Sequence, residues 1–354
     1  EITRDEFYAH IPADVLGTVL NYEISQDNLQ DVFEDVDHCL NGEHLDLIVG
    51  GPPCQAYSIV GRARSATGMV GDQRNYLYTL YAEFLARYQP DYFVFENVMG
   101  LLSARDEDGR LHFDKMRERF AECGYSVEYK VLNARDYGVL QNRKRIILIG
   151  KHGDYRDFYP EIEQIRHDCL VAEVLSDLPP IAAGGGQPDL VNTLPYYGQY
   201  LYDAHLKEVD GQPVTLHWAR PNTEQDLEIY RLVADEWNHN HRRIRYCDLP
   251  LRLQTHKNTK AFLDRFKVVS QDLPYSQTVV AHISKDGHYY IHPTQNRSLT
   301  PREAARLQTF PDDYYFESVS GEPSRTTAYR QIGNAVPVRL AECVARAMNA
   351  IWDD

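Results

Sequence analysis

Three short polar segments, far apart in the chain, combine residue types that could act together on one ligand. Cys54 follows Gly50-Gly51-Pro52-Pro53, which ends an apolar run at 45–49. Glu96 follows a second apolar run at 91–95, and Arg145 begins a third. A thiolate is a strong nucleophile, a carboxyl group exchanges protons, and a guanidinium stabilises developing negative charge. Because α/β sheets bind ligands at the carboxyl ends of their strands, we expect these side chains to surround one cavity.

Each of these residues also has a structural explanation. A lone cysteine such as Cys54 is often a small buried hydrophobe at a tight turn, and Glu96 could cap a following helix. Arg143 and Arg145, which point to one side of an extended segment, could be solvated, and Asn334 could be a turn residue before a helix. The order of the segments along the chain favours a shared site over these separate explanations.

The elements that must position these residues alternate between strand and helix. Strands are predicted over 45–49, 91–95, 125–132 and 145–150, and helices over 76–88 and 113–122. Such alternation predicts an α/β fold with a doubly wound, mostly parallel sheet and helices on both faces. The polar loop that follows Cys54 is long and contains glycines, which is typical of a functional loop.

The second half of the chain has weaker patterns. A Pro- and Gly-rich segment at 178–188 predicts a linker, and periodicity is poor from 189 to 296. The segment 189–296 is rich in basic residues, including Arg242, Arg243 and Arg245. These residues could face nucleic-acid phosphates, or they could form the charged face of ordinary helices. Beyond it, Thr300, Pro301 and Glu303 predict a capped helix start, and a final helix is predicted from Val336 onward.

Composition limits the possible functions. The 354 residues, 43% hydrophobic and 25% charged, are typical of a soluble protein with one large or two ordinary domains. No signal peptide or membrane-spanning run is found, so a location in the cytoplasm or the nucleus is expected, and the cytoplasm is favoured. Six scattered cysteines predict neither a zinc site nor a disulfide scaffold, and no metal is expected. The net charge of −15 argues against a nucleic-acid partner. It is a sum over the whole chain, however, and phosphate binding depends on a locally basic face.

The motifs and their order resemble those of the cytosine-5 DNA methyltransferases. Pro52-Pro53-Cys54-Gln55 is similar to the nucleophile motif of that family, and Glu96-Asn97-Val98 to its Glu-Asn-Val motif. Further similar motifs are Gln141 to Arg145, the segment from Arg297 to Pro311, and Gly333-Asn334-Ala335-Val336-Pro337. The resemblance covers roughly 45–182 and 297–353, and the region between is where the family varies.

The resemblance implies a role for each catalytic candidate. Cys54 would add to carbon 6 of cytosine and so make carbon 5 nucleophilic toward a methyl group. Glu96 would hydrogen-bond ring N3 and the exocyclic amine, and Arg145 would hold O2, with Arg143 and Gln141 supporting that wall. The implied methyl donor is S-adenosylmethionine.

The resemblance also implies how the two substrates are bound. The target cytosine must be flipped out of double-stranded DNA, and the loop 55–74 would close over it, with Ser58, Arg62 and Arg64 placed to touch DNA. The residues that would line the methyl-donor pocket are Gly51, Pro53, Leu77, Asn334 and Val336. A Rossmann-like catalytic domain is expected over 1–182 and 318–354, and a target-recognition domain over 183–317.

The chain departs from the family pattern before Cys54. The family begins with a strand and a Phe-x-Gly-x-Gly turn that holds the methionine part of the donor, and no such turn is found here. The sequence could omit residues, a second chain could supply the turn, or the protein could be inactive. We favour the first explanation because the downstream motifs are present, and otherwise expect a monomer. Asp27 is the candidate for the acidic group near the donor's adenine.

Two rival functions remain open. Transfer RNA could replace DNA as the methyl acceptor, although the long basic segment at 189–296 favours DNA. A non-catalytic DNA-binding or partner subunit would explain the missing turn. A metal-dependent nuclease is disfavoured because no carboxylate or histidine cluster has ligand spacing. The leading expectation is a restriction–modification type of enzyme associated with a bacterial or phage nucleoid.

Overall fold

The structure forms two units, each of which is described by itself. In the computed structural model, residues 4–52, 76–257 and 263–352 are described. Unit 1 comprises 1–132 and 144–160, and unit 2 comprises 133–143 and 161–354. The predicted division into a catalytic domain (1–182 and 318–354) and a recognition domain (183–317) concerns function and stays a prediction.

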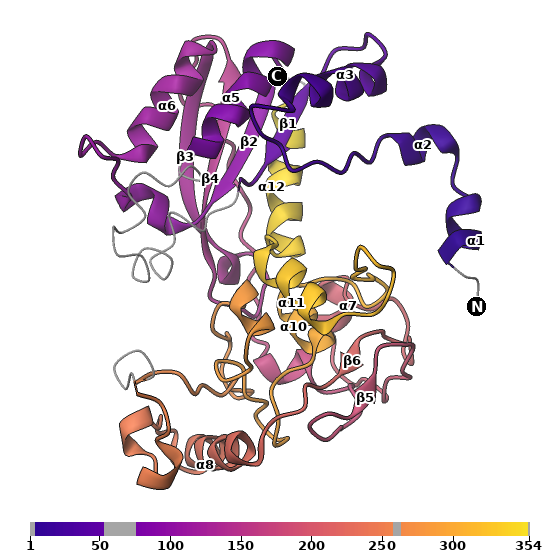
Figure 1. Ribbon diagram of the computed structural model, residues 1–354, viewed down its shortest axis with the longest axis vertical. Coiled ribbons are helices and arrows are strands. Elements are labelled where there is room, and N and C mark those ends of the chain that lie inside the picture. Colours follow the sequence, from indigo (N-terminus) through magenta and orange to yellow (C-terminus); the bar gives the residue numbers. More distant parts are fainter. Residues whose placement is uncertain (1–3, 53–75, 258–262, 353–354) are drawn as a thin grey trace. The chain divides into compact units, whose positions relative to one another are not determined.

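Unit 1 is built on a four-stranded sheet of order β1-β2-β4-β3 (Figure 1). The strands are β1 Leu47–Gly50, β2 Tyr92–Asn97, β3 Tyr125–Asn133 and β4 Lys144–His152. β1 pairs parallel with β2, whereas β4 pairs antiparallel with β2 along six residue pairs. The predicted α/β class is confirmed, and the sheet is mixed.

The antiparallel direction of β4 follows from the short connection between β3 and β4. A parallel neighbour requires a crossover of about a dozen or more residues, usually through a helix. Between β3 and β4 the chain has only residues 134–143, which contain the short 3-10 helix η3, Ala134–Asp136. Helix–strand alternation predicted parallel pairing, but this connection has no room for a crossover helix.

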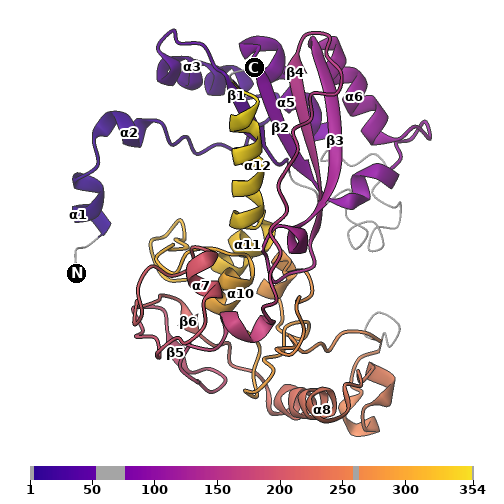
Figure 2. The same ribbon diagram turned by 180° about the vertical axis from the view of Figure 1, so that it is seen from behind.

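Helices α5 and α6 cover one face of this sheet in both views (Figures 1 and 2). The helices of unit 1 are α1 Arg4–Ala9, α2 Ala13–Gly17, α3 Leu29–Leu40, α5 Leu77–Tyr88 and α6 His112–Glu122, with the 3-10 helix η2 Met99–Ser103. Tyr81 from α5 and Phe120 from α6 pack edge-to-face against Phe93 and Phe95 of β2. This aromatic core fixes the strand whose end carries Glu96.

The regular structure described in unit 2 is mainly helical, and long irregular segments connect its elements. Its α-helices and strands are β5 Gly186–Gln187, α7 Tyr200–Asp203, β6 His217–Trp218, α8 Glu224–Asn240, α10 Pro301–Leu307, α11 Arg325–Asn334 and α12 Val338–Ala350. Its further 3-10 helices are η4 Val171–Val174, η5 Tyr246–Asp248, η6 Leu251–Leu253 and η7 Ala281–Ser284. Among the described helices of both units, none combines the length and apolar character needed to cross a bilayer.

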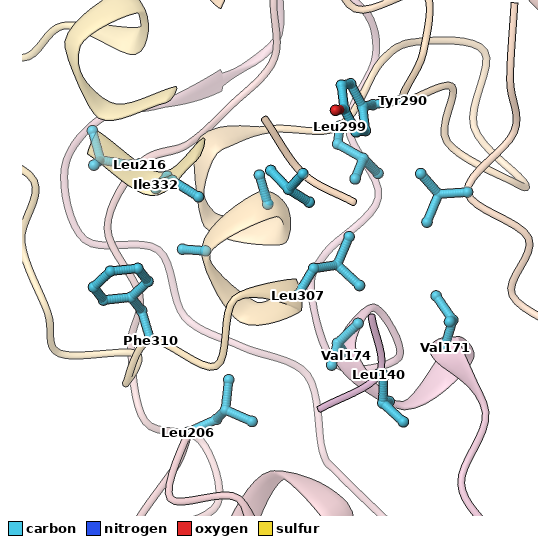
Figure 3. Packing of buried hydrophobic residues seen from close by; sticks show 14 of the residues in the cluster. Leu140, Val171, Val174, Leu206, Leu216, Tyr290, Leu299, Leu307, Phe310 and Ile332 are labelled. Atoms are coloured by element: carbon cyan, nitrogen blue, oxygen red, sulfur yellow. The ribbon is translucent and has the colours of Figure 1, made fainter. Parts of the chain in front are cut away.

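The predicted start of α10 is confirmed in detail. Thr300 accepts a hydrogen bond from the backbone N–H of Glu303, and the Glu303 carboxylate accepts from the N–H of Thr300 at 2.7 Å. The buried core of unit 2 surrounds this helix, with Leu307, Ile332, Phe310 and Leu216 among its members (Figure 3). The final helix α12 begins at Val338 because Pro337 takes the N-cap position, so Val336 lies outside it.

Helix α8, Glu224–Asn240, is the largest element that the sequence pattern did not predict. Its first turn has a capping box between Thr223 and Asp226, a local signal that was present in the sequence. Ile229, Tyr230 and Val233 are its buried positions. The apolar face is narrow because charged and other polar residues together make up more than half of the helix, which explains the weak periodicity.

Candidate active site

Glu96 and Arg145 meet at one end of the sheet in unit 1. Glu96 is the next-to-last residue of β2, and Arg145 is the second residue of the antiparallel neighbour β4. The Arg145 Nε lies 2.7 Å from the Glu96 Oε1, and their side chains are only 10% and 19% exposed. The Arg145 Nη1 also donates to the Lys144 carbonyl at 2.8 Å. A short, largely desolvated ion pair therefore presents a carboxylate and a guanidinium side by side.

The glycines after β1 lie against this pair. A Cβ on Gly51 would be 3.1 Å from the Glu96 Oε2, so only a residue without a side chain fits comfortably. A Cβ on Gly50 would be 2.5 Å from the Tyr81 ring, whose hydroxyl lies 3.1 Å from the carbonyls of Ile48 and Val94. The two glycines let the chain leave β1 close to the carboxylate.

Asn97 is a further positioning residue that the sequence analysis named only as part of a motif. It is fully buried, and its Nδ2 donates to the Pro52 carbonyl at 3.4 Å. Its Oδ1 accepts from the Val98 N–H at 2.9 Å, which fixes the amide orientation. Asn97 thus ties the end of β2 to the segment that leads toward Cys54.

Several predicted site residues lie outside the described part of the chain. These are Pro53, Cys54, Ser58, Arg62 and Arg64. Their roles stay predictions.

Two other predicted binding residues of unit 1 are described. Leu77 begins α5 and is half-buried. Asp27 is exposed just before α3. Their predicted contacts with the methyl donor are not tested by these positions.

Gln141 and Arg143 belong to unit 2 and are fully buried. The Gln141 Nε2 donates to the Leu307 carbonyl at 2.8 Å, and its Oε1 accepts from the Val279 N–H at 2.9 Å. The Arg143 guanidinium donates to the carbonyls of Val279, Gly333 and Ala335 at 2.5, 3.1 and 2.7 Å. Both side chains therefore hold backbone segments in place within the unit.

Gln308 completes this polar network. Its Oε1 accepts from the Gln141 Nε2 at 3.0 Å, and its Nε2 donates to the carbonyls of Ile332 and Ala335 at 2.6 and 3.1 Å. The network thereby surrounds the end of α11 with side-chain donors. Asn334, the last residue of α11, is exposed, and Val336 is half-buried.

Buried charges stabilise the same unit. Arg306 is fully buried, and its Nη2 and Nε donate to the Asp312 carboxylate at 2.6 and 2.8 Å. Its Nη1 donates to Asp177 at 2.5 Å, and Lys207 also pairs with Asp177. Burial opposes the charge, but the two carboxylates outweigh it and raise the pKa of Arg306. The four charges compensate one another away from water.

A second buried group holds Glu303. Its carboxylate accepts from the Arg297 Nη1 and Nη2 at 2.8 and 2.6 Å, and the His292 Nε2 lies 3.5 Å away. Burial opposes ionisation, but Arg297 outweighs it and keeps the pKa of Glu303 well below its usual range. Burial lowers the pKa of His292 to about 4. The predicted capping residue Glu303 is thus also one partner of a buried ion pair.

The predicted DNA-facing arginines lie on the surface of unit 2. Arg242 pairs with Glu236 at 2.5 Å, Arg243 with Asp264 at 2.5 Å, and Arg245 with Asp248 at 3.7 Å. Their side chains are 66%, 43% and 61% exposed. A phosphate at this face would have to compete with these carboxylates.

One group among the described residues has the chemistry of a metal site. The ligand atoms of His44, Asp46 and Asp91 lie within 4.8 Å of one another, and all three residues are exposed. They precede the parallel strands β1 and β2, whereas Gly51 and Glu96 lie at the opposite ends of these strands. This group is therefore separate from the Glu96–Arg145 pair.

The chain was compared with known proteins. A family model described as C-5 cytosine-specific DNA methylase matches residues 19–350. The type II methyltransferase M.Bpa9945I of Bacillus paralicheniformis is 44% identical over 326 residues, which cover 87% of this chain and 71% of that protein. The type II methyltransferase M.DdeI of Desulfomicrobium norvegicum is 31% identical over 353 residues, 94% of this chain and 81% of that protein.

A solved structure supports the fold. A prophage-encoded DNA modification methyltransferase (E. coli) matches with a TM-score of 0.59 at 22% identity, over 94% of this chain and 84% of that chain. At this identity the match shows that the α/β architecture is shared. The family model and the curated relatives show that this chain belongs to the C-5 cytosine-specific DNA methylases.

Proposed function

We propose that this enzyme transfers a methyl group from S-adenosylmethionine to carbon 5 of a flipped-out cytosine in double-stranded DNA, at a short specific sequence. The observation that carries the proposal is the Glu96–Arg145 pair beside the backbone that leads from Gly51 to Cys54. A carboxylate and a guanidinium at 2.7 Å match the donor and acceptor atoms along one edge of cytosine.

The proposed chemistry uses these side chains in turn. The Cys54 thiolate adds to carbon 6, and the electron pair of the 5–6 double bond becomes available at carbon 5. Glu96 accepts from the exocyclic amine and hydrogen-bonds at N3, and Arg145 donates to O2 as negative charge develops there. After methylation, loss of the proton on carbon 5 restores the double bond and expels Cys54 as a thiolate.

S-adenosylmethionine supplies an electrophilic methyl group when it is bound. The chain offers surfaces that suit it: Gly51 leaves the carboxyl end of β1 without a side chain, where α/β sheets bind ligands. Leu77 adds half-buried apolar surface. Pro53, Asn334 and Val336 are proposed as further contacts on the strength of the motifs, and Asp27 as the acidic group near the donor's adenine.

Binding of the target requires an extruded base. Flipping costs about a few kcal/mol of unstacking and unpairing, which contacts between the protein and the DNA must offset. We assign such contacts to Ser58, Arg62 and Arg64, and backbone contacts to the surface that carries Arg242. Within this scheme Gln141 and Arg143 are positioning residues, because both are fully buried and bound to backbone carbonyls.

The proposed biological setting follows from the reaction. The relatives are named type II methyltransferases, which favours a role in restriction–modification. We place the enzyme with the DNA it modifies, in a bacterial or phage nucleoid.

A methyl-transfer assay with tritiated donor tests the proposal. Cys54→Ala should abolish transfer to duplex DNA, and Cys123→Ala, a control cysteine on the α6 side of unit 1, should retain it. Glu96→Gln should lower kcat by about 10²–10³-fold, since an amide can hydrogen-bond the base but cannot exchange a proton with N3. The matched control is Glu118→Gln, because Glu118 on α6 is paired with Arg110 and is 58% exposed.

The outcomes separate the alternatives. Full activity in Cys54→Ala would refute the covalent mechanism. Labelling of transfer RNA in preference to duplex DNA would identify an RNA enzyme. Absence of donor binding in calorimetry with the full-length gene product would favour a non-catalytic subunit. Bisulfite sequencing of DNA from expressing cells would give the activity and the recognised sequence together.

A further inference from the structure

Unit 2 contains a cavity of about 390 Å³ where the first turns of α8 and α11 meet the end of η7. The residues that matter for its chemistry are basic or carry hydroxyls: Arg220, Thr223, Ser284, Lys285, Arg325 and Thr326. Such a lining suits a small, multiply charged oxyanion.

Three positive charges, Arg220, Lys285 and Arg325, line this cavity against two carboxylates. Asp286 also lines it but is paired with Arg265. Asp226 accepts from the Thr223 N–H at 3.3 Å as part of the α8 capping box. Within the described residues, no carboxylate forms an ion pair with Arg220, Lys285 or Arg325. The cavity therefore has an excess of positive charge.

The two guanidinium groups are held in fixed positions. The Arg220 Nη2 donates to the Ile283 carbonyl at 2.6 Å, and its Cζ lies 5.4 Å from the Tyr329 ring centroid. Arg325 donates to the Ala219 carbonyl, and its Cζ lies 4.1 Å from the centre of the Trp218 ring. A guanidinium has five N–H donors, so each retains donors for a ligand.

Burial lowers the pKa of Arg325, and the charge of Arg220 lowers it further. Two mutually repelling cations are thus kept near each other, and neither forms an ion pair with a carboxylate of the described residues. An anion that enters the cavity would relieve this repulsion. The starts of α8 and α11 add the partial positive charge of a helix N-terminus.

A second cavity in unit 2 serves as a contrast. It measures about 460 Å³ and is lined by Trp237, Arg242 and Arg243 among others. Both of these arginines are paired, with Glu236 and Asp264 respectively. An anion would gain less there, because each positive charge already has a carboxylate partner.

We propose that the cavity formed by Arg220, Lys285 and Arg325 binds a backbone phosphate of duplex DNA. This inference rests on the proposed function, which makes DNA the substrate. A phosphate contact positions the duplex without reading its sequence. The cavity would therefore fix the position of the proposed target-recognition domain on the duplex. It would strengthen binding to every DNA sequence equally.

The salt dependence of DNA binding tests this proposal. Fluorescence anisotropy with a labelled duplex of mixed sequence gives the slope of log Kobs against log salt concentration. Each phosphate contact adds about 0.9 to the magnitude of this slope, so Lys285→Gln should reduce it by about that amount. Lys285 is exposed, which makes a folding defect in this variant unexpected. Arg325→Gln should reduce the slope similarly.

Arg330→Gln is the matched control. Arg330 is an exposed residue of the same helix α11 and does not line the cavity, so its removal subtracts the same charge elsewhere. Its slope should equal that of the wild type. Equal slopes for Lys285→Gln and the wild type would overturn the proposal, as would an equal loss in Arg330→Gln.

Two further measurements separate the sources of failure. Calorimetric titration with inorganic phosphate shows whether the cavity binds a free anion. If Lys285→Gln abolishes phosphate binding but leaves the salt slope of DNA binding unchanged, the ligand of the cavity is a free anion and the DNA assignment is overturned. Methyl transfer by the wild type is measured on the same duplex pool. If the wild type methylates DNA but Lys285→Gln has the wild-type salt slope, only the proposed role of the cavity is rejected. If the wild type labels no DNA, the proposed function itself is rejected.

Discussion

Gly333 offers a test in which two physical effects oppose each other. It lies inside α11, where Ala in place of Gly normally stabilises a helix by about 1 kcal/mol. A Cβ at this position would however lie 2.2 Å from the backbone nitrogen of Ala281 and 2.3 Å from the carbonyl carbon of Val280. Backbone atoms cannot rotate away as a side chain can, and such overpacking costs about 1–3 kcal/mol or more.

The steric effect should win in Gly333→Ala. We expect a net loss of at least about 1 kcal/mol in the free energy of unfolding, because η7 and the end of α11 must separate. The same movement would pull the Gly333 and Ala335 carbonyls away from Arg143, so methyl transfer should fall as well.

Urea unfolding followed by circular dichroism measures this loss. The control is Gly17→Ala at the end of α2, since a Cβ there meets nothing within 4 Å. Its unfolding midpoint should equal or slightly exceed that of the wild type. If Gly333→Ala unfolds at the wild-type midpoint or above it, the close approach of α11 to η7 is not a feature of the folded protein and the reasoning fails.

Two further predictions concern buried polar residues of unit 2. Burial lowers the pKa of His292 from 6.5 to about 4, so the native state binds fewer protons than the unfolded chain in this range. Stability should therefore fall by up to about 3 kcal/mol as the pH drops from 6.5 to 4, and His292→Asn should remove this part of the fall in urea titrations across that range. Thr300→Ala should cost about 1 kcal/mol through loss of the α10 cap, whereas Thr300→Ser should keep most of the stability; equal unfolding midpoints for the two would contradict the cap's role.

Local signals in the sequence predicted local structure well. Thr300, Pro301 and Glu303 predicted the start of α10 because capping depends on neighbours within one turn. The predicted helix 76–88 corresponds to α5 because its apolar positions repeat at helical spacing. The start of α8 has a comparable capping signal in Thr223 and Asp226. Hydrophobic periodicity alone does not reveal this signal, so the helix was not predicted.

Features that depend on distant segments could not be predicted in this way. The direction of β4 follows from the connection at 134–143, which alternation of elements does not reveal. The order of motifs predicted that Glu96 and Arg145 would share a site, and the structure brings them to 2.7 Å. The burial of Arg143, in contrast, depends on Val279, 136 positions away in the sequence, so its partners could not be found from spacing.

The enclosed charges around Arg306 have a consequence for how this protein behaves in concentrated electrolyte. Dissolved ions weaken attraction between charges that face solvent, but they cannot enter the dry space that Arg306 shares with Asp177 and Asp312. Raising ionic strength should therefore detach the enzyme from its polyanionic substrate long before it loosens this part of the architecture. Dissociation from DNA and unfolding should therefore occur at different salt concentrations, and enzyme eluted from DNA with salt should still be folded.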